Sequence, residues 1–234
     1  MNRRLLSLAA ISTLFVATAG AQISNGGFES GSFAPWTTTG LTAVTGTFSA
    51  QAPNEGSFQA ALTTNASGTV NQASLESFLG LNSGTLNSLN GAGTTNRGGS
   101  AIAQTFTVAN GAIIQFAWNF LPNGSNSSSS QNDSAFFTLH LSSASSSSFT
   151  LLDQSSNHPG SASGYSIFTT GPLAAGTYIL GFGVYDVAGT GGPANVQDPA
   201  LLIDRVSVVP EPATWSLIVI GLGVAAVAIR RRIA

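Results

Sequence analysis

The residue whose setting points most clearly to chemistry is Asp204, which lies in a run of alternating apolar residues near the C-terminus. In an extended strand Asp204 shares a face with Leu202, Val206 and Val208, and we expect this face to be buried in the core. A buried carboxylate is costly without partners, so it requires hydrogen-bond donors or a cation. Calcium, which prefers several oxygen ligands, is one candidate. Backbone amides and an arginine are the others, and the residues alone leave all three open.

Three further carboxylates, Asp133, Asp186 and Asp198, lie in or beside polar and glycine-rich loops. A second oxygen-rich site is one interpretation of this grouping. The alternative, which we favour, is that each aspartate hydrogen-bonds its own backbone in a turn.

Candidate catalytic residues are few. The chain has no cysteine, and its two histidines are His140, in an alternating strand pattern, and His158, before a proline. Many different serines could be combined with a histidine and an aspartate into a Ser-His-Asp triad, so such a match does not indicate catalysis. No Gly-x-Ser-x-Gly motif is present. We therefore expect no enzymatic activity. The alternative, an enzyme that acts on extracellular polysaccharide, requires acidic residues or histidines clustered in a cleft.

Aromatic side chains are the usual platform for sugar stacking. Trp118 alternates with other apolar residues and is predicted to lie in the core. Trp36, Tyr165 and Tyr185 are less constrained: each is open to a ligand surface, but hydrophobic packing is the prediction for all three.

The charge of the chain excludes one class of partner. Five of the seven basic residues lie at the two ends of the chain, which leaves Arg97 and Arg205 in the segment between them, together with eight carboxylates. A segment so poor in cations cannot neutralise a phosphate backbone, so nucleic acid is excluded as a partner.

The region between the two ends predicts a mainly β fold. Residues 101–108 and 114–120 alternate with a period of two and are connected through Asn110-Gly111, which predicts a hairpin. Further strands are predicted at 136–141, 149–152, 165–169, 177–185 and 201–209. Short strands separated by Gly, Ser and Asn turns indicate an antiparallel β-sandwich or jelly roll.

One stretch, residues 74–90, is predicted to be helical. Leu75, Phe78 and Leu79 have helical spacing, with Ser74 as the N-cap and Gly80 as the stop.

The N-terminus predicts an export signal over residues 1–21. Arg3 and Arg4 supply a basic start, an apolar segment follows, and Ala19 and Ala21 form an Ala-x-Ala cleavage site. The mature chain would begin at Gln22, and residues 22–209 are long enough for one extracytoplasmic domain.

The C-terminal 210–234 segment has three parts. Pro210, Glu211 and Pro212 precede an apolar run over 213–229, and the basic residues Arg230, Arg231 and Arg232 follow it. A helix of this run is about 25 Å long, which predicts a short transmembrane helix with a cytoplasmic basic stop. The arrangement resembles the PEP-CTERM sorting signal of Gram-negative bacteria. That resemblance implies an exosortase in the inner membrane as a transient partner and a cut near Pro210–Pro212; the alternative is a plain single-pass anchor.

Two weaker resemblances concern the domain itself. The segment Asn25-Gly26-Gly27-Phe28-Glu29 resembles the start of jelly-roll carbohydrate-binding modules. In those modules an early Glu and a late-strand Asp bind a structural calcium, which implies a Ca²⁺ site at Glu29 and Asp204. Segments 116–121, 175–186 and 200–204 resemble a β-sandwich domain that recurs in PEP-CTERM proteins and carries no known activity.

Together these features predict an exported, non-enzymatic protein of the cell surface or exopolysaccharide matrix. Its role would be structural, adhesive or glycan-binding, and a passive spacer or cargo domain is a further alternative. The residues that bind a ligand are not identified by the sequence.

Overall fold

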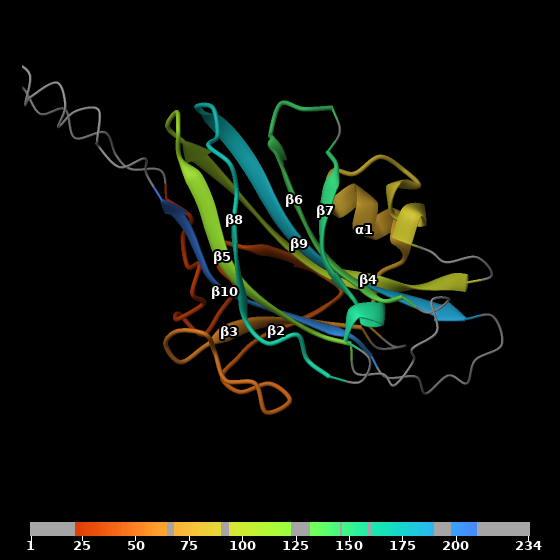
Figure 1. Ribbon diagram of the computed structural model, residues 1–234. Coiled ribbons are helices and arrows are strands. Elements are labelled where there is room, and N and C mark those ends of the chain that lie inside the picture. The colour runs from red at the N-terminus through yellow and green to blue at the C-terminus, as the bar shows by residue number, and fades with distance from the viewer. Residues whose placement is uncertain are drawn as a thin grey trace, which may run out of the picture.

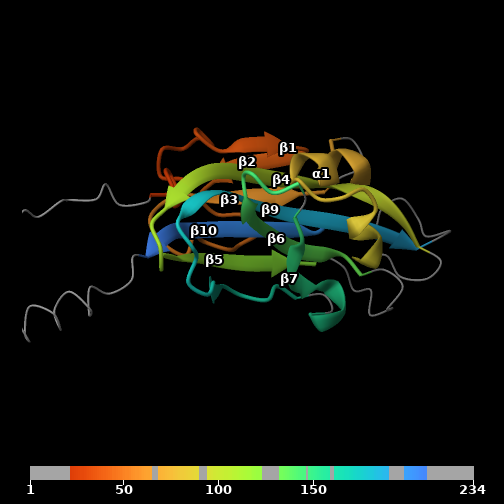
Figure 2. The ribbon, with the colours of Figure 1, turned by 90° about the horizontal axis from the view of Figure 1, so that it is seen from above.

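The computed structural model describes residues 22–64, 68–89, 94–122, 132–145, 147–158, 161–189 and 198–209. In this part of the chain two five-stranded sheets pack face to face, with a short helix on the outside of one of them (Figures 1 and 2). All the strand pairings are antiparallel. The predicted mainly-β sandwich with one helical segment is therefore confirmed.

Each sheet mixes strands from distant parts of the chain. Sheet A has the order β1 (Thr37–Thr39), β4 (Thr94–Val108), β9 (Gly176–Gly189), β6 (Ser134–Leu141) and β7 (Phe149–Gln154). Sheet B has the order β2 (Leu41–Thr45), β3 (Gln59–Thr63), β10 (Ala200–Val209), β5 (Ile113–Leu121) and β8 (Ser166–Thr169). The last strand, β10, thus lies at the centre of sheet B.

The core between the sheets is rich in phenylalanine. Phe116 of sheet B contacts Phe182 and Phe137 of sheet A, with ring centroids 4.7 and 5.3 Å apart in edge-on geometry. All three are almost fully buried. Trp118 is partly buried and packs against the same cluster, as its alternation predicts. The described residues between 22 and 209 thus share a hydrophobic core between the two sheets.

The predicted hairpin between residues 101 and 120 is wrong, although both strands exist. β4 pairs with β9 and β1 in sheet A, whereas β5 pairs with β10 and β8 in sheet B. The Asn110-Gly111 turn, with Gly111 at φ +84°, carries the chain from one sheet to the other. Gly111 N–H donates to the Leu173 carbonyl at 2.8 Å and Leu173 N–H donates to the Ala112 carbonyl at 2.8 Å, so a neighbouring segment holds this turn.

The helical stretch is shorter than predicted and covers the outer face of sheet A. Helix α1 spans Gln72–Phe78 and is capped by Asn71, whose side chain accepts from Ser74 N–H at 2.9 Å, so Ser74 is not the N-cap. Gly80, at φ +67°, follows the helix as the predicted stop. A 3₁₀ helix, η1 (Thr85–Leu89), completes the cover, and a second one, η2 (Ser155–Asn157), follows β7.

Predictions at the two ends of the chain lie outside the described residues. These are the signal segment 1–21 with Ala19 and Ala21, and the tail 210–234 with its residues Pro210, Glu211, Pro212, Arg230, Arg231 and Arg232. Within the ranges that the structure describes, no helix has the length and apolarity to cross a membrane.

Candidate functional site

A bulge in β10 sets the position of Asp204. The register with β5 shifts between Asp204 and Ser207, and Arg205 takes a left-handed backbone conformation with φ +53°. Such a bulge adds one residue to the strand and moves the following side chains to the opposite face. Ile203 and Val206 consequently both lie in the core between the sheets. Asp204 shares the outer face of sheet B with Leu202, which packs in a separate cluster there.

Asp204 is therefore buried as predicted, but on the other face. Its exposed fraction is 0%. The prediction that Asp204 points into the inter-sheet core with Val206 and Val208 is wrong, because strict alternation ends at the bulge. Two other segments of the chain lie against the carboxylate instead.

The first of these segments is the N-terminal turn, residues 25–29. Val206 N–H donates to the Gly26 carbonyl at 2.9 Å. A Cβ atom on Gly26 would lie 1.8 Å from the Val206 carbonyl oxygen, so only glycine permits this approach. Phe28, buried at φ +58°, packs on Trp36 with ring centroids 5.6 Å apart. The turn thus brings Glu29 to the side of β10 where Asp204 lies.

The second segment is the loop at residues 54–58, which binds both predicted carboxylates. Glu55 N–H donates to Asp204 Oδ2 at 2.9 Å. Ser57 and Phe58 N–H groups donate to Glu29 Oε1 at 3.0 and 2.9 Å. Gly56 is left-handed, and a Cβ there would lie 2.4 Å from Glu29 Oε1. One loop thus connects the first turn of the domain to its last strand.

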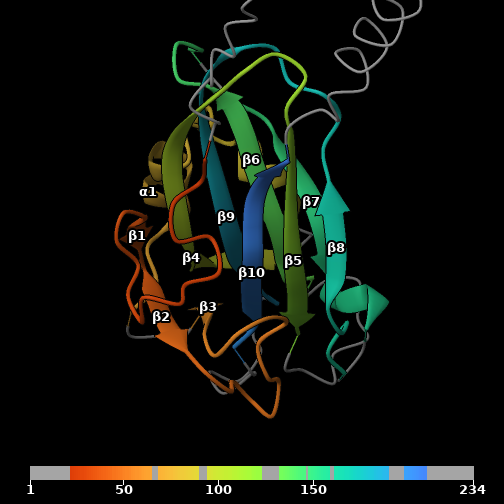
Figure 3. The same cartoon turned by 90° about the vertical axis from the view of Figure 1, so that its left-hand side faces the viewer.

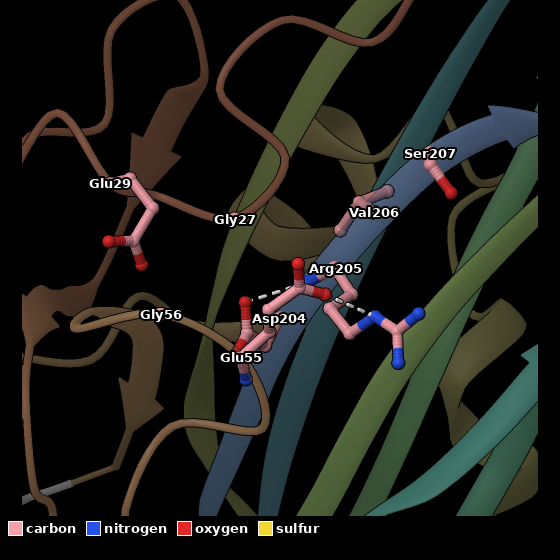
Figure 4. Close-up of a pocket in the computed structure, with 8 residues that line it drawn as sticks. All are labelled: Gly27, Glu29, Glu55, Gly56, Asp204, Arg205, Val206 and Ser207. Atoms are coloured by element: carbon pink, nitrogen blue, oxygen red, sulfur yellow. Dashed lines mark hydrogen bonds and ion pairs between the residues drawn. The ribbon is translucent and has the colours of Figure 1, made fainter.

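These segments border an open pocket of about 400 Å³, which we call the acidic pocket. It is lined by Gly27, Glu29, Glu55, Gly56, Asp204, Arg205, Val206 and Ser207 (Figure 4). Arg205 Nε lies 2.7 Å from Glu55 Oε2, and both side chains are well exposed, at 46% and 67%. The predicted pair, Glu29 and Asp204, is thus brought to one pocket.

The charge of Asp204 is only partly compensated. Burial raises the pKa of its carboxyl from the ordinary value of 3.8, and the nearby Glu29 raises this pKa further. Backbone amides of Glu55, Arg205 and Asn54 act in the opposite direction. Arg205 N–H donates to Asp204 Oδ1 at 2.7 Å, but its guanidinium pairs with Glu55. The pKa of the half-buried Tyr165 is also raised, first by burial and then by the charge of Asp204.

The donors of the acidic pocket fit a hard cation in kind. The side-chain ligands that the pocket offers to a metal ion are carboxylate oxygens. The buried carboxylate of Asp204 accepts hydrogen bonds from backbone amides, whereas the Arg205 guanidinium pairs with Glu55. However, the described ranges contain no group of three or more His, Cys, Asp or Glu residues arranged to hold a metal ion. A calcium ion at Glu29 and Asp204 would therefore complete its shell with backbone carbonyls or water.

The other predicted polar candidates lie elsewhere. Asp133 Oδ1 accepts from Val187 N–H at 2.9 Å, so this bond joins the aspartate to the backbone of a distant strand and not, as predicted, to that of its own turn. His158 Nε2 lies 3.0 Å from the buried Asp153, a contact that the sequence analysis missed. His140 is half-buried beside Gly80 on the outside of sheet A, and burial lowers its pKa.

The aromatic candidates pack rather than line the acidic pocket. Trp36 is 5% exposed and donates from Nε1 to the Asn25 carbonyl at 3.2 Å. Tyr185 is fully buried under α1, where its hydroxyl donates to Gln72 Oε1 at 2.8 Å. Tyr165 donates its hydroxyl to Gln59 Oε1 on the outer face of sheet B.

Sequence reasoning missed two residues of the pocket, Glu55 and Arg205. The backbone N–H of Glu55 bonds Asp204, 149 positions later in the chain, and the position of Arg205 depends on the bulge, so local patterns do not connect these residues. The signal that was present is Arg205 itself, an arginine directly after the buried Asp204 in a segment with almost no other cations.

Comparison with known proteins gave structural likenesses at low identity. A search of curated proteins found no match. TmCBM61, solved in complex with beta-1,4-galactotriose, is 12% identical, with 81% of this chain and 97% of that chain covered and a TM-score of 0.48. The CBM22-1 xylan-binding domain of Xyn10C from Paenibacillus barcinonensis is 13% identical, with 78% and 90% covered and a TM-score of 0.38.

The C-terminus gave a match to a family model. The model of the PEP-CTERM protein-sorting motif covers residues 208–232, which include the Pro-Glu-Pro element, the apolar run and the three arginines. The chain therefore carries a PEP-CTERM sorting motif and is an exported protein that is sorted, as a membrane-anchored precursor, to the cell exterior.

Proposed function

We propose that this chain is a non-enzymatic glycan-binding protein of the bacterial surface or exopolysaccharide matrix. Residues 1–21 direct export, the apolar run over 213–229 holds the precursor in the inner membrane, and an exosortase cuts near Pro210–Pro212. The cut breaks one peptide bond by addition of water and leaves a new carboxylate on the domain. The mature 22–209 domain then acts through the acidic pocket.

The observation that carries the proposal is the polar chemistry of the acidic pocket. Exposed Glu55 and Arg205 hold each other at 2.7 Å, and Glu29 is fixed by two backbone amides. Adjacent hydroxyl groups of a sugar ring are bound by hydrogen-bond acceptors and donors held at fixed positions. Charged groups make stronger hydrogen bonds than neutral groups do. A pocket of about 400 Å³ lies within the size range of small-molecule binding sites, about 300–1,000 Å³.

A structural Ca²⁺ at Glu29 and Asp204 is the second part of the proposal. The buried, raised-pKa carboxylate of Asp204 supports it, because a cation would remove the cost that burial imposes on this charge. The ion would hold the N-terminal turn, the 54–58 loop and β10 together, and so shape the wall on which Glu55 and Arg205 sit. It would take no part in a reaction.

The test is binding of the mature domain to a panel of the host's own polysaccharides, with calcium and with a chelator. Arg205→Gly removes the proposed cationic donor and Glu55→Gln removes the charge of the proposed acceptor; glycine accepts the left-handed conformation at position 205 without strain. We expect each variant to bind at least about tenfold more weakly, since one charge-assisted hydrogen bond is worth about 1.5–3 kcal/mol. Thr105→Ala, on the outer face of sheet A, is the matched control.

The outcomes separate the competing functions. Equal binding by the wild type and both pocket variants would place the glycan site elsewhere. Release of sugar products would overturn the non-enzymatic proposal in favour of a polysaccharide-active enzyme. No binding to any polysaccharide would favour a structural spacer, and equal melting temperatures with calcium and with chelator would remove the ion.

A further inference from the structure

The last strand is held unequally along its length. Residues Ala200–Ile203 of β10 pair with β3 on one side and with β5 on the other. After the bulge, Ser207, Val208 and Val209 pair with β5 alone, opposite Gln115, Ile114 and Ile113. Figure 3 shows this end of β10 beside β5, beyond the reach of β3.

The residues on either side of the bulge, Asp204 and Val206, are held by several contacts. Val206 is 4% exposed, lies in the core, and donates its N–H to the Gly26 carbonyl. Asp204 is fixed by the amides of Glu55 and Arg205. The three residues beyond Val206 are only half-buried. The strand therefore has an anchored part, up to Val206, and a lightly held end of three residues.

The sorting motif begins within that end. Its match starts at position 208, whereas β10 continues to Val209 and the Pro-Glu-Pro element follows directly. An enzyme that cuts a peptide takes an extended segment on both sides of the bond, commonly by main-chain hydrogen bonds. A cut near Pro210–Pro212 thus requires main-chain groups that β5 holds in the folded domain.

We propose that Ser207–Val209 separates from β5 as a unit and is the segment by which the domain presents its tail to a membrane-embedded processing enzyme. The bulge at Arg205 and the anchored Val206 end this separation, so the sandwich stays folded while the end of β10 is in the enzyme. Local opening of this kind is expected where few backbone bonds and little buried surface hold a segment. The inference rests on the proposed function in so far as the tail is cut.

A disulfide that locks the strand end tests the inference in cells. The chain has no cysteine, so Ile113→Cys with Val209→Cys introduces a single pair at positions that are register partners. Paired strand residues lie about 4.5–5.5 Å apart between Cα atoms, which a disulfide spans. Thr107→Cys with Thr177→Cys, register partners in sheet A with hydroxyls 3.1 Å apart, is the matched control.

We expect the oxidised 113–209 lock to slow tail removal at least about tenfold, measured by the mass of the protein over time, and reduction to restore it. The 107–177 lock should leave processing unchanged. Equal processing in both locked forms would overturn the inference while leaving the proposed processing intact. A wild-type tail that is never removed would overturn both.

Amide exchange gives a readout that does not depend on processing. In the unlocked chain the amides of Ser207 and Val209 should exchange at least about a hundredfold faster than those of Leu201 and Ile203. Similar exchange rates in the two halves of β10 would contradict the inference whatever happens to the tail.

Discussion

At the scale of single residues, Asp204 shows how a charge can be buried without an ion pair. Three backbone amides point to its carboxylate, yet its pKa stays above the ordinary value because the cost of burial exceeds their effect. The neighbouring guanidinium of Arg205 is engaged by Glu55. Asp204 is therefore a residue whose stability contribution depends on pH and on any bound cation.

The pH dependence follows from the direction of that shift. Because the folded-state pKa lies above 3.8, the folded protein binds this proton more tightly than the unfolded chain does. With a chelator present, the contribution of Asp204 to the free energy of unfolding should rise as the pH falls from neutral through the folded-state pKa, and level off below 3.8. Melting curves between pH 7 and about 3.5 measure it.

Two variants assign the effect to this carboxylate. Asp204→Asn should abolish the rise, and should cost about 1–3 kcal/mol at low pH because its amide group faces a backbone donor. Glu55→Gln, an exposed carboxylate in the same pocket, should keep the wild-type profile. Calcium should reverse the sign, since the ion binds the ionised carboxylate and is lost on acidification. An Asp204→Asn profile parallel to that of the wild type would exclude Asp204 as the group that titrates.

At the scale of elements, the outside of sheet A depends on the small residues of β9. A Cβ on Gly181 would lie 2.5 Å from a methyl carbon of Leu79, and one on Gly183 would lie 2.5 Å from the ring of Phe136. Both neighbours are buried beneath or within the α1–η1 cover. The glycines therefore allow the helical segment to pack closely on the sheet.

We expect Gly183→Ala to destabilise the domain by about 1–3 kcal/mol, because the fully buried Phe136 ring must shift to accommodate the methyl group. Gly171→Ala is the matched control, since a Cβ there meets nothing within 4 Å, and it should stay within about 0.5 kcal/mol of the wild type. Urea unfolding of the mature domain measures both. Equal effects of the two substitutions would show that β9 has room for a side chain.

Sequence patterns predicted the strands better than their partners. β5, β6 and β9 were found because their apolar residues alternate, but the three threonines of β1 have no such pattern. Asn110-Gly111 marks a reversal of the chain, and its local signal does not reveal that the two strands enter different sheets. The burial of Asp204 was predicted, whereas its face was not, because a bulge is set by long-range contacts such as that of Val206 with Gly26.

At the scale of the whole molecule, charge contributes little to the fold. Charged residues make up 7% of the chain, and five of its seven basic residues lie at the ends. Among the described residues, the Arg205–Glu55 pair is exposed, and such pairs are worth about 0–1 kcal/mol. Backbone pairing and the aromatic core carry the stability instead.

The unfolding free energy of the mature domain should therefore be nearly independent of ionic strength. Between about 20 mM and 200 mM sodium chloride, with chelator present, we expect a change below about 0.5 kcal/mol, since screening acts chiefly on exposed charges. Urea unfolding at the two salt concentrations measures it. A loss of more than about 1 kcal/mol at the higher concentration would show that ion pairs are a larger part of the stability.

The central place of β10 in sheet B has a consequence for the order of events during export. On a crossing that runs from the N- to the C-terminus, β2 and β3 arrive early, β5 and β8 later, and the strand that joins these two pairs arrives last. Until then each pair has an open strand edge, the kind of surface that promotes aggregation. Because the match to the sorting motif begins at position 208, within the last two residues of β10, a chain truncated before the joining strand also lacks the motif. The strand that completes sheet B thus runs into the motif that directs sorting. A chain that carries the motif therefore also carries every strand of the domain.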